Sequence, residues 1–263
     1  MAQQNSRAAA IVDIHAHILP GLDDGSYDWE MTVEMAQMAA RSGVAAIVAT
    51  PHCGLPEQEM EGRAERIRSK VRDMRALLTQ QQIPLIVCPG MEIFGTEETP
   101  ELLRQGQLLT LNGSRYPLIE FPFTDYGLEA TRILERVRMD GYIPVVAHPE
   151  RYLYVQEDPC LLNLWVDIGC LLQLNRGSLM GRFSETAQML ALAMVDRGFA
   201  CTVASDAHTS VSRTPWMADV EDLLRQEFSE EYTQRLLHQR PLTLLRDQEI
   251  SMPEPLRLSN SLR

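Results

Sequence analysis

Short runs of apolar residues recur along the chain, and longer stretches with helical spacing of apolar residues separate them. Each run is rich in residues that favour β-structure and is bounded by turn residues, which is the pattern of a buried strand. The runs predicted as strands are 11–18, 45–50, 84–93, 116–123, 143–148, 171–175 and 199–205.

The stretches between these runs are predicted to be helical. In one of them, Met31, Met35 and Met38 fall at i, i+4 and i+7, which places them on one face of a helix. In another, Ser184 stands where a side chain would cap the first turn. Further helices are predicted over 57–82, which is charged and indicates a long surface helix, and over 127–140 and 184–197.

The repeated alternation of strand and helix predicts parallel strands joined by right-handed crossovers. This pattern leaves two architectures open, a closed α/β barrel and a doubly wound open sheet. A chain of 263 residues fits one large α/β domain. We assign 11–250 to that domain, 1–10 to a flexible N-terminal extension and 251–263 to a loose C-terminal tail.

The composition indicates which kinds of partner and which cellular location are expected. The formal net charge of -12 argues against a nucleic-acid partner, because phosphate backbones are bound by Lys and Arg. No apolar run approaches the roughly 20 residues of a membrane-spanning helix, and 1–10 lacks the apolar core of a signal peptide. The five cysteines form no C-x-x-C motif, and Cys88, Cys170 and Cys201 fall at or in predicted strands. We therefore expect reduced, mostly buried thiols in a cytoplasmic protein that is not embedded in a membrane.

Histidines give the strongest functional signal. Five of the six lie within or at the ends of predicted strands, and only His238 lies in a helical segment. Active sites of parallel barrels form at the carboxyl ends of the strands, so five separated histidines are predicted to converge there. A single buried histidine is more often a hydrogen-bonded core residue than a metal ligand, so the signal lies in the set. The five are His15, His17, His52, His148 and His208.

Carboxylates accompany these histidines. His15 and His17 are two residues apart on a strand and point to the same face, and Asp206 and His208 repeat this spacing. Mixed imidazole and carboxylate ligands suit Zn²⁺, Mn²⁺ or Fe²⁺ better than Ca²⁺ or Mg²⁺. About nine ligands exceed the four to six that one ion uses, so we expect two or three ions and one bridging carboxylate. The other acidic candidates near strand ends are Asp23, Asp24, Glu92 and Glu120.

Two arginines lie close to the candidate ligands in sequence. Arg151 follows His148 by three residues, and Arg213 follows His208 by five. A planar guanidinium binds phosphate oxygens through two parallel N–H groups, whereas an isolated surface arginine commonly forms a salt bridge. Beside the candidate ligands, both arginines indicate a phosphorylated substrate.

The complete series of motifs resembles the polymerase-and-histidinol-phosphatase (PHP) superfamily, and within it the bacterial capsule-type protein tyrosine phosphatases. An H-x-H motif alone is unspecific, but the series spans nearly the whole chain in the family's order. The motifs are DIHAHILPGLDDG (13–25), ATPH (49–52), GMEI (90–93), IEFP (119–122), AHPER (147–151), LQLNRGSLMG (172–181) and SDAH with Arg213 (205–213).

The resemblance implies a distorted seven-stranded TIM-like α/β barrel with three divalent metal ions, Mn²⁺ being favoured and Zn²⁺ or Fe²⁺ being alternatives. It favours Asp24 over Asp23 as a ligand, because the family's ligand lies seven residues after the second histidine. It also implies that Arg151 and Arg213 contact phosphate. The implied ligands are His15, His17, Asp24, His52, Glu92, Glu120, His148, Asp206 and His208.

The sequence departs from the family's usual pattern in two motifs. In the last motif, Thr209 replaces an Asn and Thr214 stands between Arg213 and Pro215, where the family usually has R-P; Cys53 stands where a second histidine often follows ATPH. These differences bear on how the substrate is bound and leave the implied metal ligands intact.

The implied reaction is hydrolysis of a phosphomonoester by in-line attack of metal-bound hydroxide, with His52 or Asp206 as a candidate acid. The implied substrate is phosphotyrosine on a bacterial tyrosine autokinase of capsular or exopolysaccharide biosynthesis. Histidinol phosphate or another small phosphomonoester is the alternative substrate on the same site. Nothing in the pattern specifies an oligomeric state.

Three other classes of protein share single features with this sequence. Cys170 and Arg176 form the C-x5-R signature of cysteine phosphatases, but a strand of six residues would separate them by ~20 Å. Metal-dependent amidohydrolases typically carry a lysine ligand in mid-barrel, whereas the only lysine here, Lys70, lies in the charged helix. A catalytically inactive binding module would be expected to have lost ligands, and none is missing from the series.

Overall fold

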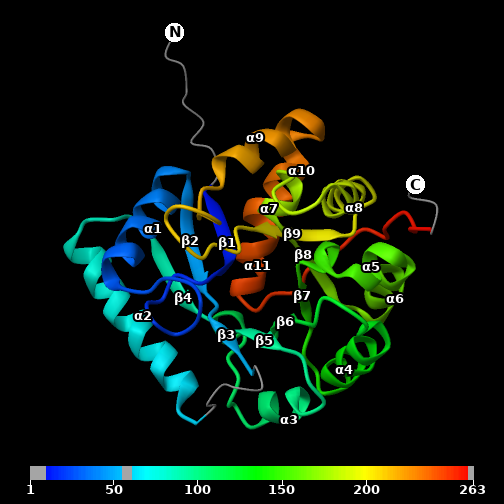
Figure 1. Ribbon diagram of the computed structural model, residues 1–263, viewed down its shortest axis with the longest axis horizontal. Coiled ribbons are helices and arrows are strands. Elements are labelled where there is room, and N and C mark those ends of the chain that lie inside the picture. Colours follow the sequence, from blue (N-terminus) through cyan, green and yellow to red (C-terminus); the bar gives the residue numbers. More distant parts are fainter. Residues whose placement is uncertain (1–9, 55–60, 260–263) are drawn as a thin grey trace.

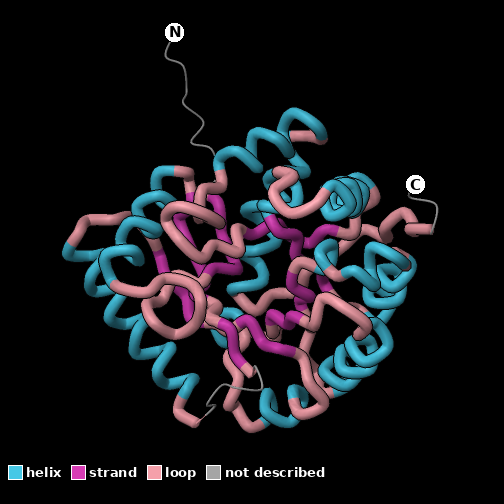
Figure 2. The backbone as a smooth tube through the Cα atoms, viewed as in Figure 1, coloured by secondary structure: helices cyan, strands magenta, loops and turns pink. Residues whose placement is uncertain are grey.

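In the computed structural model, parallel strands lie at the centre of the molecule and helices surround them (Figures 1 and 2). The structure describes residues 10–54 and 61–259. One sheet has the order β1-β2-β4 and the other the order β3-β5-β6-β7-β8-β9. The strands are β1 (Ile11–Ala16), β2 (Val44–Ala49), β3 (His52–Cys53), β4 (Ile86–Pro89), β5 (Glu92–Phe94), β6 (Leu118–Glu120), β7 (Val145–Ala147), β8 (Leu171–Asn175) and β9 (Ala200–Ala204).

The two sheets are continuous along the chain. Only two residues separate β2 from β3, and two separate β4 from β5. The predicted strand 84–93 therefore continues from one sheet into the other, whereas the predicted run 45–50 ends before β3, which was not predicted. Gly90 lies at the second junction, where a Cβ atom would come within 2.8 Å of Val48 Cγ1. A residue with a side chain would therefore force the neighbouring strands apart.

The last strand also reaches the first. The backbone N–H of Asp206 donates to the carbonyl of His15 at 2.9 Å, and that of His17 donates to Ala207 at 2.8 Å. Strand order follows chain order within each sheet, whereas a doubly wound sheet reverses its order at a switch point. The predicted α/β class with parallel strands is confirmed, and the doubly wound alternative is wrong.

Helices follow most strands and cover the sheets. Met31 and Met35 of α1 are buried, as the spacing predicts, and Met38 is half-buried. Ser184 caps α8 by accepting a hydrogen bond from the N–H of Ala187 at 3.1 Å. The helices are α1 (Trp29–Arg41), α2 (Arg63–Gln80), α3 (Thr99–Arg104), α4 (Gly127–Met139), α5 (Leu153–Glu157), α6 (Cys160–Ile168), α7 (Arg176–Leu179), α8 (Glu185–Asp196), α9 (Ala218–Glu227), α10 (Glu230–Gln234) and α11 (Arg240–Leu245), with short turns η1 (Leu111–Gly113), η2 (Pro149–Arg151) and η3 (Arg235–Gln239).

The predicted helices at 127–140 and 184–197 are confirmed as α4 and α8. Of the predicted helix 57–82, α2 accounts for Arg63–Gln80, and the first residues of that prediction lie outside the described part of the chain. None of the described helices has both the length and the apolar character that crossing a membrane requires. The cysteines form no disulfide within the described residues, and Cys88, Cys170 and Cys201 are buried, as predicted.

The C-terminal segment is more ordered than the sequence suggested. Residues 251–259 contain no helix or strand, but Leu258 is buried and its N–H donates to Asn163 Oδ1 at 3.0 Å. Arg257 pairs with Asp167 at 2.8 Å. One buried apolar side chain and contacts with two polar residues of α6 thus hold this stretch against that helix, although it has no regular secondary structure. The predicted extension 1–10 lies almost wholly outside the described residues.

Candidate metal centre

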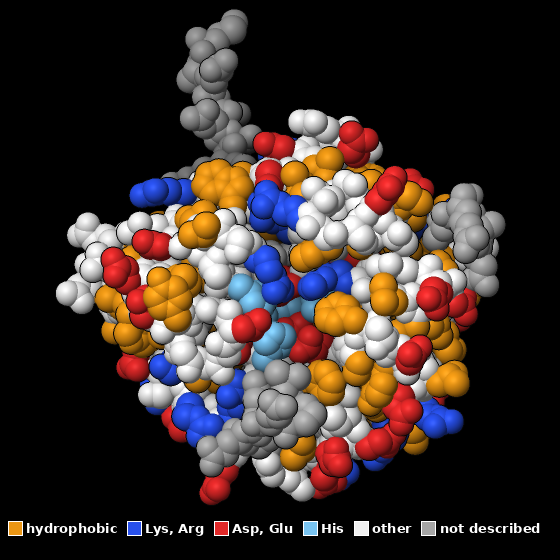
Figure 3. Space-filling view, viewed as in Figure 1, with side chains coloured by type: hydrophobic (Ala, Val, Ile, Leu, Met, Phe, Trp, Pro, Cys, Tyr) orange, Lys and Arg blue, Asp and Glu red, His pale blue; other side chains and the backbone are white. Residues whose placement is uncertain are grey.

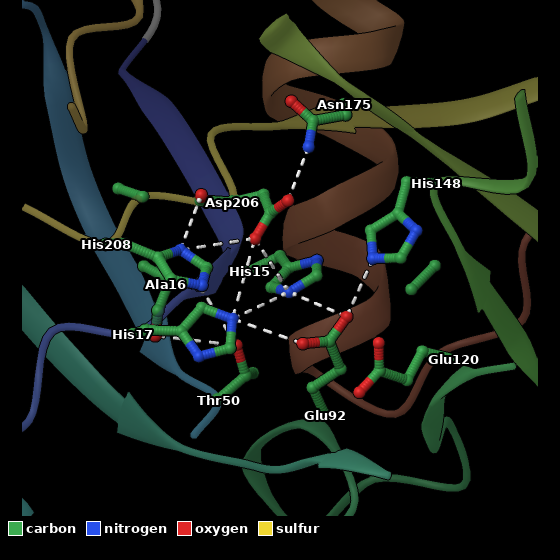
Figure 4. A network of polar contacts seen from close by, with 12 residues as sticks. His15, Ala16, His17, Thr50, Glu92, Glu120, His148, Asn175, Asp206 and His208 are labelled. Carbon is green, nitrogen blue, oxygen red and sulfur yellow. Dashed lines mark hydrogen bonds and ion pairs between the residues drawn. The ribbon is translucent and has the colours of Figure 1, made fainter. Parts of the chain in front are cut away.

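The end of strand β1 and the residue that follows it bring two imidazoles to the same point. His15 and His17 are both fully buried, and their Nε2 atoms lie 3.3 Å apart (Figure 4). The Nδ1 atom of His15 is 2.9 Å from Gln173 Oε1, and the Nδ1 atom of His17 is 2.6 Å from Asp23 Oδ2. Each ring is thus oriented by a hydrogen bond at its Nδ1 atom, and its Nε2 atom faces the centre of the site.

Glu92 lies at the start of β5 and contacts four imidazoles. Its Oε1 atom is 3.2 Å from His15 Nε2 and 2.9 Å from His148 Nε2. Its Oε2 atom is 3.1 Å from His17 Nε2 and 3.0 Å from His52 Nδ1. A buried carboxylate with two histidines on each oxygen has the position expected of a bridging ligand.

Asp206 lies just after β9, and its two carboxylate oxygens contact different groups of residues. Its Oδ1 atom lies 3.5 Å from the Nε2 atoms of both His15 and His17. Its Oδ2 atom accepts hydrogen bonds from Arg151 at 3.2 Å and from Arg213 at 2.7 Å. One carboxylate therefore faces the imidazoles and also fixes both arginines that the sequence singled out.

Three residues of the site hold left-handed backbone conformations. The φ angle is 35° at His148, 50° at Asp206 and 48° at Arg213. Non-glycine residues seldom adopt positive φ, and the surrounding structure must stabilise them there. Here the N–H of Asp206 donates to the carbonyl of His15, the carbonyl of Arg213 accepts from the N–H of His208, and the Arg213 side chain donates to Asp206.

The outer part of the site is more open. Asp24 Oδ1 lies 3.5 Å from the Nε2 atoms of both His52 and His208, and the Asp24 side chain is 66% exposed. Glu120, at the end of β6, lies 2.7 Å from His52 Nδ1. Figure 3 shows histidine and acidic side chains at the floor of a hollow, with basic and hydrophobic side chains beside them.

These side chains form four groups whose ligand atoms lie within 4.8 Å of one another. The donor set fits divalent cations that accept both imidazole and carboxylate ligands. Asp206 Oδ1 and His208 Nε2 are buried without a hydrogen-bond partner in the described structure, as expected of atoms that coordinate an ion. The groups are His17, Asp24, His52 and His208; His15, Glu92 and His148; His15, His17 and Asp206; and His52, Glu92 and Glu120.

The electrostatics of the site follow from this arrangement. Burial would raise the pKa of Glu92, but the charge of His15 and the nearby imidazole hydrogen bonds hold it well below its usual value. Burial would lower the pKa of His52, but its hydrogen bonds with Glu120 and Glu92 raise it to about 10. Without metal, protons on His15, His17 and His52, whose pKa values are raised, balance the carboxylates, and bound cations would take the place of these protons.

All nine side chains implied as ligands, together with both arginines, meet in this one region. The preference for Asp24 over Asp23 as a ligand also has a geometric basis. Asp24 lies near the Nε2 atoms of two imidazoles at the open side of the site, whereas Asp23 contacts the Nδ1 atom of His17. The role of each as a ligand stays a prediction. His238 lies elsewhere, buried 3.5 Å from Glu221.

Three residues support the site in a way that the sequence did not indicate; Asp23 was considered only as an alternative ligand, and Gln173 and Asn175 were given no role. Asp23 and Gln173 hold the Nδ1 atoms of the β1 histidines, and Asn175 donates to Asp206 Oδ2 at 2.5 Å. The sequence could have marked Gln173 and Asn175 as candidate site residues, since two polar residues at i and i+2 of an apolar strand share a face. What they contact could not be read from that spacing.

The cysteine-phosphatase alternative is wrong. Residues Leu171–Asn175 between Cys170 and Arg176 form strand β8. Burial raises the pKa of Cys170 to about 12, so its thiol stays protonated at neutral pH. Arg176 is buried and its guanidinium pairs with Asp219 at 2.5 Å.

Comparison with known proteins agrees with this geometry. The family model for capsular polysaccharide synthesis, CpsB/CapC, matches residues 11–246. Tyrosine-protein phosphatase YwqE of Bacillus subtilis is 38% identical over 245 residues, which cover 93% of this chain and 95% of that protein. Tyrosine-protein phosphatase CpsB of Streptococcus pneumoniae is 29% identical over 245 residues, covering 91% and 100%. A chain from crystal structures of YwqE and CpsB, described as unique metal-dependent tyrosine phosphatases, matches with a TM-score of 0.89 and 36% identity, covering 95% of this chain and 100% of that one.

Proposed function

The chain belongs to the CpsB/CapC family of capsular polysaccharide synthesis, and on that premise we propose that it is a metal-dependent protein-tyrosine phosphatase. The resemblance inferred from the motifs is thereby confirmed. We further propose that the two sheets act as one distorted seven-stranded barrel, in which β2 with β3 and β4 with β5 each count as a single bent strand.

The observation that carries the proposal is the position of Glu92. Four imidazoles, two from strands β1 and β3 and two from the residues directly after β1 and β7, surround its two oxygens within 3.2 Å. A cluster of this kind would be costly as a purely structural core, because each buried polar group left unsatisfied costs roughly 1–3 kcal/mol. Metal binding would explain why these four imidazoles and the Glu92 carboxylate are buried together.

We propose that three divalent ions bind here, with Mn²⁺ favoured and Zn²⁺ or Fe²⁺ as alternatives. The inner groups around His15 and Glu92 and the outer group around Asp24 and His208 supply the ligands. A bound divalent cation lowers the pKa of water toward ~7 and thereby supplies a nucleophile at neutral pH.

The remaining residues bind and orient the phosphate ester. Arg151 and Arg213 share Asp206 Oδ2, which keeps both guanidinium groups at the same edge of the site. There they neutralise charge on the phosphate oxygens. His52 is the imidazole nearest solvent, with a 19% exposed side chain, so it is better placed than the buried Asp206 to assist a departing phenolate.

The physiological substrate proposed here is a phosphorylated tyrosine of a bacterial tyrosine kinase in capsular or exopolysaccharide biosynthesis, acted on in the cytoplasm. Support comes from the family's connection with capsular polysaccharide synthesis and from the tyrosine-phosphatase activity named for its relatives.

The test compares a phosphotyrosine peptide with histidinol phosphate, each with Mn²⁺, Zn²⁺ or Fe²⁺ after treatment with EDTA. The wild-type protein should hydrolyse the peptide faster, and His208→Ala should abolish turnover and lower the metal content measured by mass spectrometry. Arg246→Ala, on the exposed C-terminal side of α11, is the matched control and should behave as the wild type. Full activity of His208→Ala, or activity that survives complete removal of metal, would refute the proposal.

A further inference from the structure

Two aromatic rings flank the guanidinium of Arg151 at the edge of the metal site. The guanidinium carbon lies 4.9 Å from the ring centroid of Phe123 and 4.1 Å from that of Phe183. Aromatic faces attract cations at such distances, and the contact orients a planar guanidinium. Its Nη1 atom meanwhile donates to Asp206. The rings therefore help to fix the edge that Arg151 presents to a phosphate.

The two rings come from different loops, and local structure places each of them. Phe123 follows β6, and its carbonyl accepts a hydrogen bond from the N–H of Leu153 at 2.8 Å. Phe183 lies between α7 and α8 and packs over Gly177, where a Cβ atom would come within 2.7 Å of Phe183 Cε2. A side chain at position 177 would displace the ring, so this glycine allows Phe183 to reach Arg151.

Both rings remain partly open to solvent beside a strongly polar site. Phe123 is 39% exposed and Phe183 is 38% exposed. Holding Arg151 alone would not require this exposure, because a fully buried ring gives the same cation contact. Figure 3 shows hydrophobic side chains next to the basic ones at the hollow. The exposed parts of the rings thus offer an apolar surface next to the proposed phosphate-binding arginine.

We propose that Phe123 and Phe183 are specificity-determining residues that favour aryl over alkyl phosphate esters. This inference rests on the proposed phosphatase function. It identifies the two rings that would contact the tyrosine ring of the substrate. When Arg151 binds the phosphate, the ester group lies within reach of the neighbouring rings. A phenyl group packs against them, with an added aromatic contribution, whereas a short alkyl group offers little area.

Phe183 provides the cleaner test, because Phe123 also stacks on His148, with ring centroids 5.9 Å apart. The test measures inhibition constants of phenylphosphonate and ethylphosphonate against hydrolysis of a phosphotyrosine peptide by the metal-loaded protein. These two inhibitors share the phosphonate and differ in the ring, so the readout does not depend on leaving-group chemistry.

In Phe183→Leu, we expect phenylphosphonate to bind about tenfold more weakly and ethylphosphonate to weaken by about twofold or less. Phe183→Tyr should restore the preference for the aryl compound. Leu128→Ala removes a 76% exposed apolar side chain at the start of α4 and is the matched control, with both constants unchanged.

An equal loss for both inhibitors would mean that Phe183 only positions Arg151, and it would overturn the inference. Unchanged constants in Phe183→Leu would overturn it as well. If the wild-type protein hydrolysed no phosphate ester with any metal, the proposed function would fail and this inference with it.

Discussion

Asp23 supports the metal centre without belonging to the predicted ligands, and replacing it with Asn tests that distinction. Its side chain is 2% exposed. Asp23 Oδ2 accepts from His17 Nδ1 at 2.6 Å and from the N–H of His52 at 2.9 Å, and Oδ1 accepts from the N–H of Gly25 at 3.0 Å. An Asn of the same shape has no charge and only one acceptor oxygen.

Two losses are expected in Asp23→Asn. The hydrogen bond to His17 changes from charge-assisted to neutral, which costs about 1 kcal/mol. If the amide oxygen stays on that side, the amide NH₂ faces the N–H of Gly25, and this unsatisfied contact costs a further ~1–2 kcal/mol. The metal-free variant should therefore unfold with a free energy about 2–3 kcal/mol below that of the wild type.

Metal affinity should fall as well. Residues that orient a ligating histidine typically change affinity by about 10–100-fold, so the half-saturating metal concentration should rise by that factor. Excess metal should restore most of the activity of Asp23→Asn. Asp24→Asn removes a predicted ligand, so excess metal should not restore its activity.

The assay is phosphotyrosine-peptide hydrolysis as a function of Mn²⁺ concentration, combined with urea unfolding in EDTA. Asp73→Asn, on the exposed face of α2, removes the same charge far from the site and serves as the control. If Asp23→Asn showed wild-type metal dependence, or if Asp24→Asn were the variant restored by excess metal, the assignment of the two acids would be refuted.

Four further outcomes are expected. Gly177→Ala should displace Phe183 and lower the preference for phenylphosphonate without loss of bound metal; an unchanged preference in inhibition assays would contradict the packing argument. Arg213→Ala should lower kcat/KM by about 10²–10³-fold with full metal content by mass spectrometry, and a loss of metal instead would show that Arg213 only maintains the site. Because the pKa of His52 is raised to about 10 in the metal-free site, metal uptake at neutral pH should release a proton, and affinity should rise with pH; calorimetry in buffers of different ionisation enthalpy measures this, and equal heats would disprove it. Burial raises the pKa of Cys201 to about 12 from 9.0, so the unfolded chain loses this proton first and stability falls above pH 9; between pH 8 and pH 10 the wild type should lose about 1 kcal/mol more than Cys201→Ala, and parallel urea-midpoint curves would refute this.

The strand positions were predictable because they depend on local patterns. A short apolar run bounded by turn residues has few ways to bury itself other than as a central strand, and each of the seven runs contains a strand. The division of the chain between two sheets was not predictable, since 84–93 was predicted as one strand but forms β4 and β5, and the short strand β3 after the predicted run 45–50 was not predicted at all. Whether a run stays in one sheet depends on its neighbours, which the local pattern does not contain.

The sequence by itself determined the parallel α/β class and which side chains could bind metal. Spacing of two residues put His15 and His17 on one face, and the placement of acids and histidines at strand ends put them at one rim. These properties follow from backbone periodicity and chain direction, which every short segment carries within itself.

Only the tertiary structure decided how those side chains meet. It placed Glu92 between four imidazoles and Asp23 against the Nδ1 atom of His17. It also brought Phe183 into contact with Arg151, which lies 32 residues away in the sequence. These contacts depend on strand register, on left-handed backbone at residues such as Asp206, and on packing between loops. Distances of a few ångströms between remote residues are set by the summed packing of the whole domain, and no local pattern in the chain specifies them.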